Sequence, residues 1–177
     1  PNKAAQPTEA PTQQAQTTQA APTEQPTPEP DPVQQLLEEM TLEQKVGQLF
    51  LVRPDSLDLS QTQDQINDAK ADGVTDLTDA MRQTLAEYPV GGVVIFGKNL
   101  ESPQQITQFL DDLQQASDTP LFTAIDEEGG LVARLANNAA FDLPQYESAA
   151  AVGTSGNPED ARAMGLSLIH ISEPTRL

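Results

Sequence analysis

Residues 120–135, PLFTAIDEEGGLVARL, decide the fold of this chain. The proline is followed by a short apolar run, Leu121 to Ile125, which is typical of a buried strand and gives way at once to acids and two glycines. Residues 93–96, Val-Val-Ile-Phe, form a second run of the same kind. The sequence therefore predicts short buried strands at both places.

Segments with helical periodicity precede both runs. The first segment ends at Pro89, and the second begins at Ser102-Pro103, a capping residue followed by proline. Their apolar stripes are Leu77, Ala80, Met81, Leu85 and Tyr88, and Ile106, Phe109, Leu110 and Leu113. Strands that alternate with helices in this way run parallel. We therefore predict an α/β fold, for which a barrel and a doubly wound sheet are both open at this point.

The fold is predicted to begin at Asp31-Pro32, an N-cap followed by proline, with an amphipathic helix. Thr41 and Gln44 then form a capping-box pattern, and residues 46–52 are predicted to be a buried strand that ends at Arg53-Pro54. Residues 56–73 form a polar excursion before the next helix.

Composition divides the chain into three parts. Residues 1–31 are rich in Pro, Gln and Thr and are predicted to be a disordered spacer, either a tether for an exported bacterial enzyme or a plain unstructured terminus. Residues 32–165 are the folded part. Residues 166–177 resemble the translation of a DNA-library adapter and are interpreted as a non-native tail, so His170 receives no function.

Charge and composition exclude several classes of function. The net charge of −18 is spread along the chain and argues against a nucleic-acid or anionic-membrane surface. Cysteine is absent, so disulfides and thiolate sites are excluded. No apolar run is long enough to span a membrane. A lipid tether upstream of the spacer is still possible as a membrane attachment. We expect no cofactor and no metal. The residues do not fix the oligomeric state.

Asp126 is the best candidate for a functional residue, because it directly follows a predicted strand at the end that faces ligands in α/β folds. Its carboxylate can accept hydrogen bonds from vicinal sugar hydroxyls, and the glycines behind it allow a tight turn. Arg134 can donate to sugar oxygens or hold Asp126 in place. The same residues at the same spacing could also form a solvated acidic turn with an arginine on the surface, which would have no function. We predict Asp126 and Arg134 as substrate-binding residues.

Other chemistry has less support at these strand ends. Asp126 and Glu128 would suit a hard cation, but the sequence has no further ligand at the spacing of a metal site. The same two acids are also poor candidates for the catalytic pair of a glycosidase, because neighbours in one turn rarely span the required gap of about 5 Å or more. Gly97-Lys98-Asn99, after the second strand, is a secondary candidate. Lys98 is expected to be a solvated strand-end charge rather than a ligand group, and Asn99 could equally be a turn residue.

Three segments together resemble glycoside hydrolase family 3, on its β-N-acetylhexosaminidase branch. They are residues 40–49, MTLEQKVGQL, residues 91–96, GGVVIF, and residues 126–135, DEEGGLVARL. The resemblance covers residues 33–165. It departs from the family pattern at Glu127, where many relatives carry Gln, at Leu131, which is often Arg, and in the longer polar insert before Gly73.

The resemblance implies an incomplete (β/α)₈ TIM barrel in which Asp126 and Arg134 bind a terminal N-acetylhexosamine. It also implies a retaining mechanism without a metal, whose aspartate nucleophile and His-Asp acid-base pair lie in later segments with no counterpart here. No residue of this chain is therefore predicted to be catalytic, and the chain alone is expected to be inactive.

For the intact parent, the resemblance implies a glycosidase that removes terminal β-linked N-acetylhexosamine from peptidoglycan- or chitin-type glycans at or outside the surface of a bacterial cell. Two alternatives stay open. One is a family 3 β-glucosidase, and the other is an exported sugar-binding protein without a nucleophile.

Overall fold

The structure, a computed structural model, describes residues 31–172. The predicted spacer, apart from Asp31, and residues 173–177 of the predicted tail lie outside this range. The helices and strands are α1 (Pro32–Glu39), α2 (Leu42–Gly47), β1 (Leu51–Val52), α3 (Gln63–Asn67), α4 (Asp79–Glu87), β2 (Gly92–Ile95), α5 (Pro103–Ala116), β3 (Phe122–Ile125), β4 (Glu127–Gly129), β5 (Val132–Ala133), α6 (Ala149–Thr154) and α7 (Pro158–Ser172). Short 3₁₀ turns occupy Pro54–Leu57, Gly97–Asn99 and Ala139–Phe141.

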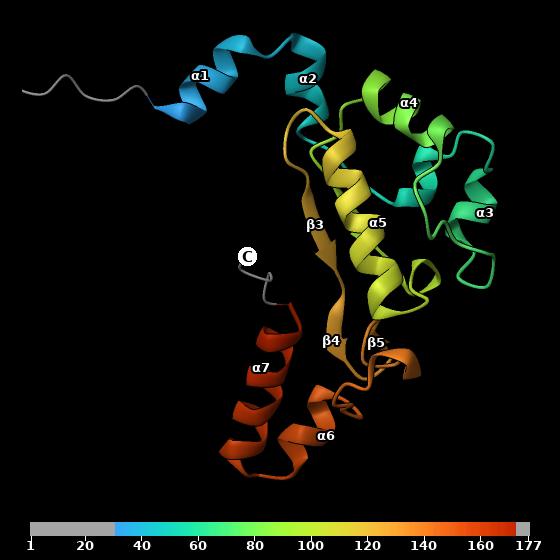
Figure 1. Cartoon of the computed structure of the whole chain (residues 1–177). Coiled ribbons are helices and arrows are strands. Elements are labelled where there is room, and N and C mark those ends of the chain that lie inside the picture. Colours follow the sequence, from blue (N-terminus) through green and yellow to red (C-terminus); the bar gives the residue numbers. More distant parts are fainter. Residues whose placement is uncertain (1–30, 173–177) are drawn as a thin grey trace, which may run out of the picture.

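A three-stranded parallel sheet organises the chain and confirms the predicted α/β class. Figure 1 labels its third strand, β3, together with the helices α4 and α5. The strands lie in the order β1-β2-β3, which is also their order in the sequence. α4 connects β1 to β2, and α5 connects β2 to β3. Because neighbouring strands are parallel, all three carboxyl ends lie at the same edge of the sheet. Side chains that directly follow the strands are therefore brought together there.

The helix starts are those expected from capping chemistry. The side chain of Asp31 accepts a hydrogen bond from the backbone of Val33, and Thr41 and Gln44 form the predicted reciprocal capping box. Ser102 likewise accepts from the backbone of Gln105 at the start of α5. These short-range bonds satisfy backbone N–H groups that a helix leaves unpaired, which is why they can be predicted locally.

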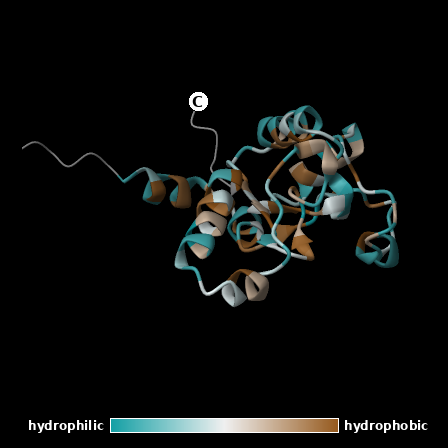
Figure 2. Cartoon of the chain, turned by 90° about the horizontal axis from the view of Figure 1, so that it is seen from below, coloured by the Kyte–Doolittle hydropathy of each residue, from teal (hydrophilic) through white to brown (hydrophobic). Residues whose placement is uncertain are grey.

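One face of the sheet is covered and the other is open. Val93 and Ile95 of β2 pack with α4 and α5 in a core that contains Leu57, Leu77, Met81, Leu85, Val90, Leu100, Phe109, Leu113 and Leu121. Phe122, whose backbone is paired with Gly92, is 72% exposed on the other face. Figure 2 shows further hydrophobic residues on α1, where Val33, Leu36 and Leu37 are exposed. The core is thus one-sided.

The prediction of a buried strand over residues 46–52 is wrong. The capping box at Thr41 begins α2, which continues to Gly47, and only Leu51 and Val52 form a strand. The segment is not buried either, since Leu49 is 79% exposed. Val52 packs against the core, whereas Val46, Leu49, Phe50 and Leu51 stay exposed beside an edge strand that has a partner on one side only.

α7 begins at Pro158, where the sequence places a helix entry, and it includes residues 166–172 of the predicted tail. The side chain of Met164 is buried. The non-native origin of residues 166–177 stays a prediction.

The open sheet leads to a first prediction. Residues 31–165, expressed alone, should unfold without a sharp cooperative transition and should bind a hydrophobic dye, because exposed edges and an uncovered apolar face leave the core incomplete. Thermal denaturation followed by circular dichroism and dye fluorescence measures this, with the intact protein as the reference. A sharp two-state transition of the isolated part would contradict the expectation.

Candidate functional site

Residues that follow each strand gather at the carboxyl edge of the sheet. Arg53 follows β1, Phe96 follows β2 and Asp126 follows β3. The guanidinium carbon of Arg53 lies 4.1 Å from the centroid of the Phe96 ring, and that of Arg134 lies 5.3 Å from it. Side chains from the three loops that follow the strands therefore share one location, as expected at the carboxyl edge of a parallel sheet.

The structure brings the two predicted site residues into contact. Nη2 of Arg134 donates to Oδ2 of Asp126 across 3.4 Å, and the backbone N–H of Arg134 donates to the backbone oxygen of Asp126 across 3.3 Å. The Asp126 side chain is 46% exposed and that of Arg134 is 28% exposed, so the pair is accessible. The geometry therefore fits one of the predicted roles of Arg134, which is to hold Asp126.

A hairpin carries Arg134 back to Asp126. β4 and β5 pair antiparallel, and the turn between them contains Gly129 and Gly130, with φ of 81° and 63°. Glycine adopts this left-handed backbone without the strain that a side chain brings. A Cβ on Gly130 would also lie 2.8 Å from the backbone oxygen of Glu147. The predicted tight turn is confirmed, and the close approach seen here is to the chain's own backbone.

Glu127 holds the base of this hairpin. Its two carboxylate oxygens accept hydrogen bonds from the backbone N–H groups of Leu135 and Ala136, at 2.8 and 3.2 Å. Glutamine has only one oxygen, so it could not accept both bonds with separate oxygen atoms. The departure from the family pattern at this position therefore has a structural account. Leu131, the other departure, is exposed on the turn between β4 and β5.

The expectation that Lys98 is a solvated charge is wrong. Its side chain is 6% exposed, and Nζ lies 3.2 Å from Oδ1 of Asp55, whose side chain is fully buried. Nζ also donates to the backbone oxygens of Gln65 and Ile66 at 3.0 and 3.1 Å. The ammonium group is therefore paired with a carboxylate and also donates to two backbone oxygens.

Asn99 completes this buried network. Its amide donates to Oδ2 of Asp55 at 3.0 Å and to the backbone oxygen of Val74 at 2.9 Å, while its oxygen accepts from the backbone N–H of Phe96. The network joins the loop after β2 to the polar excursion. The Gly97-Lys98-Asn99 segment is thus a structural support of the site.

Sequence analysis missed Arg53 as a site residue. Nη1 of Arg53 donates to the backbone oxygen of Ile66 at 2.8 Å and to Oδ1 of Asn67 at 3.4 Å. A signal was present, because Arg53 directly follows an apolar run, as Asp126 does. The signal did not depend on where β1 begins. No local sequence pattern, however, indicated that Arg53 would bond to residues 66–67.

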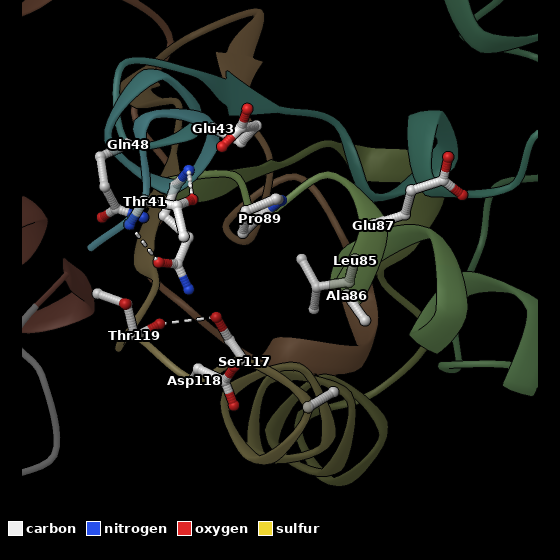
Figure 3. A pocket seen from close by; sticks show the side chains of 12 residues that line it. Thr41, Glu43, Gln48, Leu85, Ala86, Glu87, Pro89, Ser117, Asp118 and Thr119 are labelled. Atoms are coloured by element: carbon white, nitrogen blue, oxygen red, sulfur yellow. Dashed lines mark hydrogen bonds between the residues drawn. The ribbon is translucent and has the colours of Figure 1, made fainter. Parts of the chain in front are cut away.

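A cavity of about 270 Å³ lies at the opposite end of the strands (Figure 3). Pro89 and Thr119, which precede β2 and β3, line it together with the acids Glu43, Glu87 and Asp118. Ligands of open α/β sheets bind at the carboxyl ends of strands, so this position does not suit the candidate site.

Two general features of the described chain bear on function. Within residues 31–172, no group of three or more His, Asp or Glu side chains is placed to hold a metal ion. In the same range, no helix has both the length and the apolar character that crossing a membrane requires.

Glu127 provides a test of the hairpin. Glu127→Gln should lower the free energy of unfolding by about 1–3 kcal/mol, because one buried backbone donor loses its acceptor. Glu128→Gln is the matched control, since Glu128 is exposed and should change stability by less than about 0.5 kcal/mol. Urea denaturation of the intact protein measures both. Equal effects of the two substitutions would contradict the role of Glu127.

Lys98 provides a test of the buried network. Lys98→Met should destabilise the intact protein by about 3–5 kcal/mol, because it leaves the Asp55 carboxylate buried without its partner. Lys70→Met, on the exposed polar excursion, is the control and should be near neutral. If the melting temperature of the Lys98 variant matched that of the control, the pair would not be a stabilising contact.

Comparison with known proteins gives a consistent result. The profile of the glycosyl hydrolase family 3 N terminal domain matches residues 41–170. A beta-hexosaminidase of Bordetella avium is 38% identical over 68 residues, which cover 38% of this chain and 19% of that protein. Beta-hexosaminidase A of Pseudoalteromonas piscicida is 37% identical over 67 residues, covering 35% and 11%.

A solved structure is also similar. It is that of a glycoside hydrolase family 3 beta-N-acetylglucosaminidase from Paenibacillus, with 30% identity and a TM-score of 0.52, covering 71% of this chain and 20% of that one. The chain thus spans about a fifth or less of the length of these relatives. The matched profile covers most of the chain, so the chain belongs to glycosyl hydrolase family 3, through its N-terminal domain.

Proposed function

We propose that this chain is the N-terminal part of a retaining glycoside hydrolase that removes terminal β-linked N-acetylhexosamine from peptidoglycan- or chitin-type glycans. Family membership supports the reaction class, and the names of the similar proteins, beta-hexosaminidase and beta-N-acetylglucosaminidase, support the amino sugar. The observation that carries the proposal is the Asp126–Arg134 pair at the carboxyl edge of the parallel sheet.

The proposed role of Asp126 is to bind hydroxyls of the sugar. Only Oδ2 of Asp126 is used by Arg134, and a carboxylate can accept about four hydrogen bonds. Vicinal hydroxyls of a hexosamine can therefore donate to the remaining lone pairs. Arg134 keeps the carboxylate in one orientation, which reduces the entropy lost when the sugar binds.

We also propose that the sheet is the first part of a (β/α)₈ barrel. The sequential order β1-β2-β3 with a helix between strands is what a barrel requires. The exposed Phe122 and Leu51 fit this proposal, because the open face of the sheet would become the barrel interior. The nucleophile and the acid-base pair belong, in this proposal, to the strands that complete the barrel.

An extracellular or cell-surface location in a bacterium is part of the proposal. It rests on the Pro/Gln/Thr-rich composition of residues 1–31, which suits an extended tether, and on glycans of the cell wall type as substrates.

The test uses the intact protein and paired aryl glycosides. The N-acetyl-β-glucosaminide should be hydrolysed and the β-glucoside should not. Hydrolysis of the glucoside alone would favour a β-glucosidase, and binding of N-acetylglucosamine without hydrolysis of either compound would favour a sugar-binding protein.

Asp126 provides the residue-level prediction. Asp126→Ala should lower kcat/KM for the aryl N-acetyl-β-glucosaminide about 100-fold, the effect expected when hydrogen bonds to a charged group are lost. Asp118→Ala, an exposed acid on the opposite cavity, is the control. Unchanged turnover and affinity in the Asp126 variant would overturn the assignment.

A further inference from the structure

The segment that follows the β4–β5 hairpin returns to it. The chain turns at Asp142, whose φ is 45°, a left-handed backbone that is uncommon in residues other than glycine. Residues 143–148, which we call the strap, contain neither helix nor strand and lead into α6. A residue in this backbone conformation persists only where the surrounding structure imposes it, so contacts beyond Asp142 have to hold the strap in its path.

Two hydrogen bonds join the strap to the hairpin. The backbone N–H of Gly130, in the turn of the hairpin, donates to the backbone oxygen of Tyr146 across 2.8 Å. The side-chain amide of Gln145 donates to the backbone oxygen of Ala136, beyond β5, across 2.7 Å. Arg134 lies between the two bonded positions in the sequence. The strap therefore holds the chain on both sides of this arginine.

The turn of the hairpin packs closely against later parts of the chain. A Cβ built on Gly129 would lie 2.7 Å from Cε of Met164, a buried side chain of α7, and 3.7 Å from Cβ of Tyr146. α7 packs against β4, beside which it lies in Figure 1. On the next residue, Gly130, a Cβ would meet the backbone of the strap at Glu147. The turn thus has little room to move while these segments stay in place.

The Asp126–Arg134 pair needs support of this kind. Both side chains are partly exposed, and an ion pair in contact with solvent gains little from its own attraction. Glu127 holds the hairpin at its base, through the backbone N–H groups of Leu135 and Ala136. The position of Arg134 therefore depends on how firmly the backbone that carries it is held.

We propose that the strap positions Arg134 beside Asp126, and that Gln145 is the positioning residue of the strap. Gln145 acts through the backbone beyond β5 rather than on the sugar. With the strap in place, the pair is ordered before a sugar arrives, so less entropy is lost when the sugar binds. The inference rests on the proposed function, which gives the Asp126–Arg134 pair its role in sugar binding.

The first experiment separates binding from turnover. Gln145→Met removes the N–H donor and keeps the length of the side chain. In the intact protein, KM for the aryl N-acetyl-β-glucosaminide should rise about fivefold, the effect of one lost hydrogen bond, while kcat stays within about twofold. Gln104→Met, at an exposed position of α5, is the matched control and should change neither value.

A merely structural role of Gln145 gives a different result. It would reduce the amount of folded protein, which lowers the apparent kcat and leaves KM unchanged. An unchanged KM in Gln145→Met, with or without a lower kcat, would therefore overturn the inference.

Hydrogen exchange tests the strap without a substrate. In intact Gln145→Met, the amides of residues 127–136 should exchange about fivefold faster than in the unmodified protein, while those of β2 keep their rate, because only the hairpin loses a contact. Equal acceleration in both places would mean that Gln145 supports the whole fold. No acceleration would mean that it does not hold the hairpin, and either result overturns the inference.

The two experiments also distinguish this inference from the proposed function. If the unmodified protein hydrolyses no hexosaminide, the proposed function fails, and the exchange rates alone decide whether the strap holds the hairpin. If hydrolysis is normal but neither KM nor exchange responds to Gln145→Met, the strap is refuted and the proposed function stands.

Discussion

The buried ion pair between Asp55 and Lys98 is the contact on which the proposed site depends. It joins the loop after β1 to the loop after β2, and Asn99 bonds to the same carboxylate. Charges this deeply buried are tolerated only when they are paired and hydrogen-bonded, and here Lys98 pairs with Asp55 and donates to two backbone oxygens. The pair thereby fixes residues 65–66 over the sheet edge, and with them the carbonyl that holds Arg53.

A second constraint acts through the β4–β5 hairpin. Two glycines with positive φ reverse the chain within a few residues, and Glu127 accepts from the backbone beyond β5. Together with the backbone hydrogen bond from Arg134 to Asp126, these contacts keep the two residues next to each other. The hairpin carries Arg134 to the Phe96 ring, and the buried ion pair helps to hold Arg53 against the same ring. The acidic and basic groups of the site are thus positioned by two independent supports.

The sheet itself is only partly enclosed. Its core lies between one face and the helices α4 and α5, while Phe122 on the other face is largely exposed. Burial of apolar surface drives folding, so an uncovered face of this kind needs further chain to pack against it. This chain spans about a fifth of the length of the Bordetella avium and Paenibacillus relatives.

The sequence by itself determined the elements whose signals are local. Capping residues placed the starts of α1, α2 and α5, and apolar runs between turn residues placed β2 and β3. It also placed Asp126 at a strand end and left two roles open for Arg134, donating to sugar oxygens or holding Asp126, and the structure has the contact that the second role needs. Tertiary structure decided the rest. Lys98 meets Asp55 across 43 positions, and Arg53 meets Ile66 across 13, contacts that no local pattern encodes. The exposure of Val46, Leu49 and Phe50 was likewise decided by which elements are present to cover them, since burial is a property of neighbours and not of the apolar run itself.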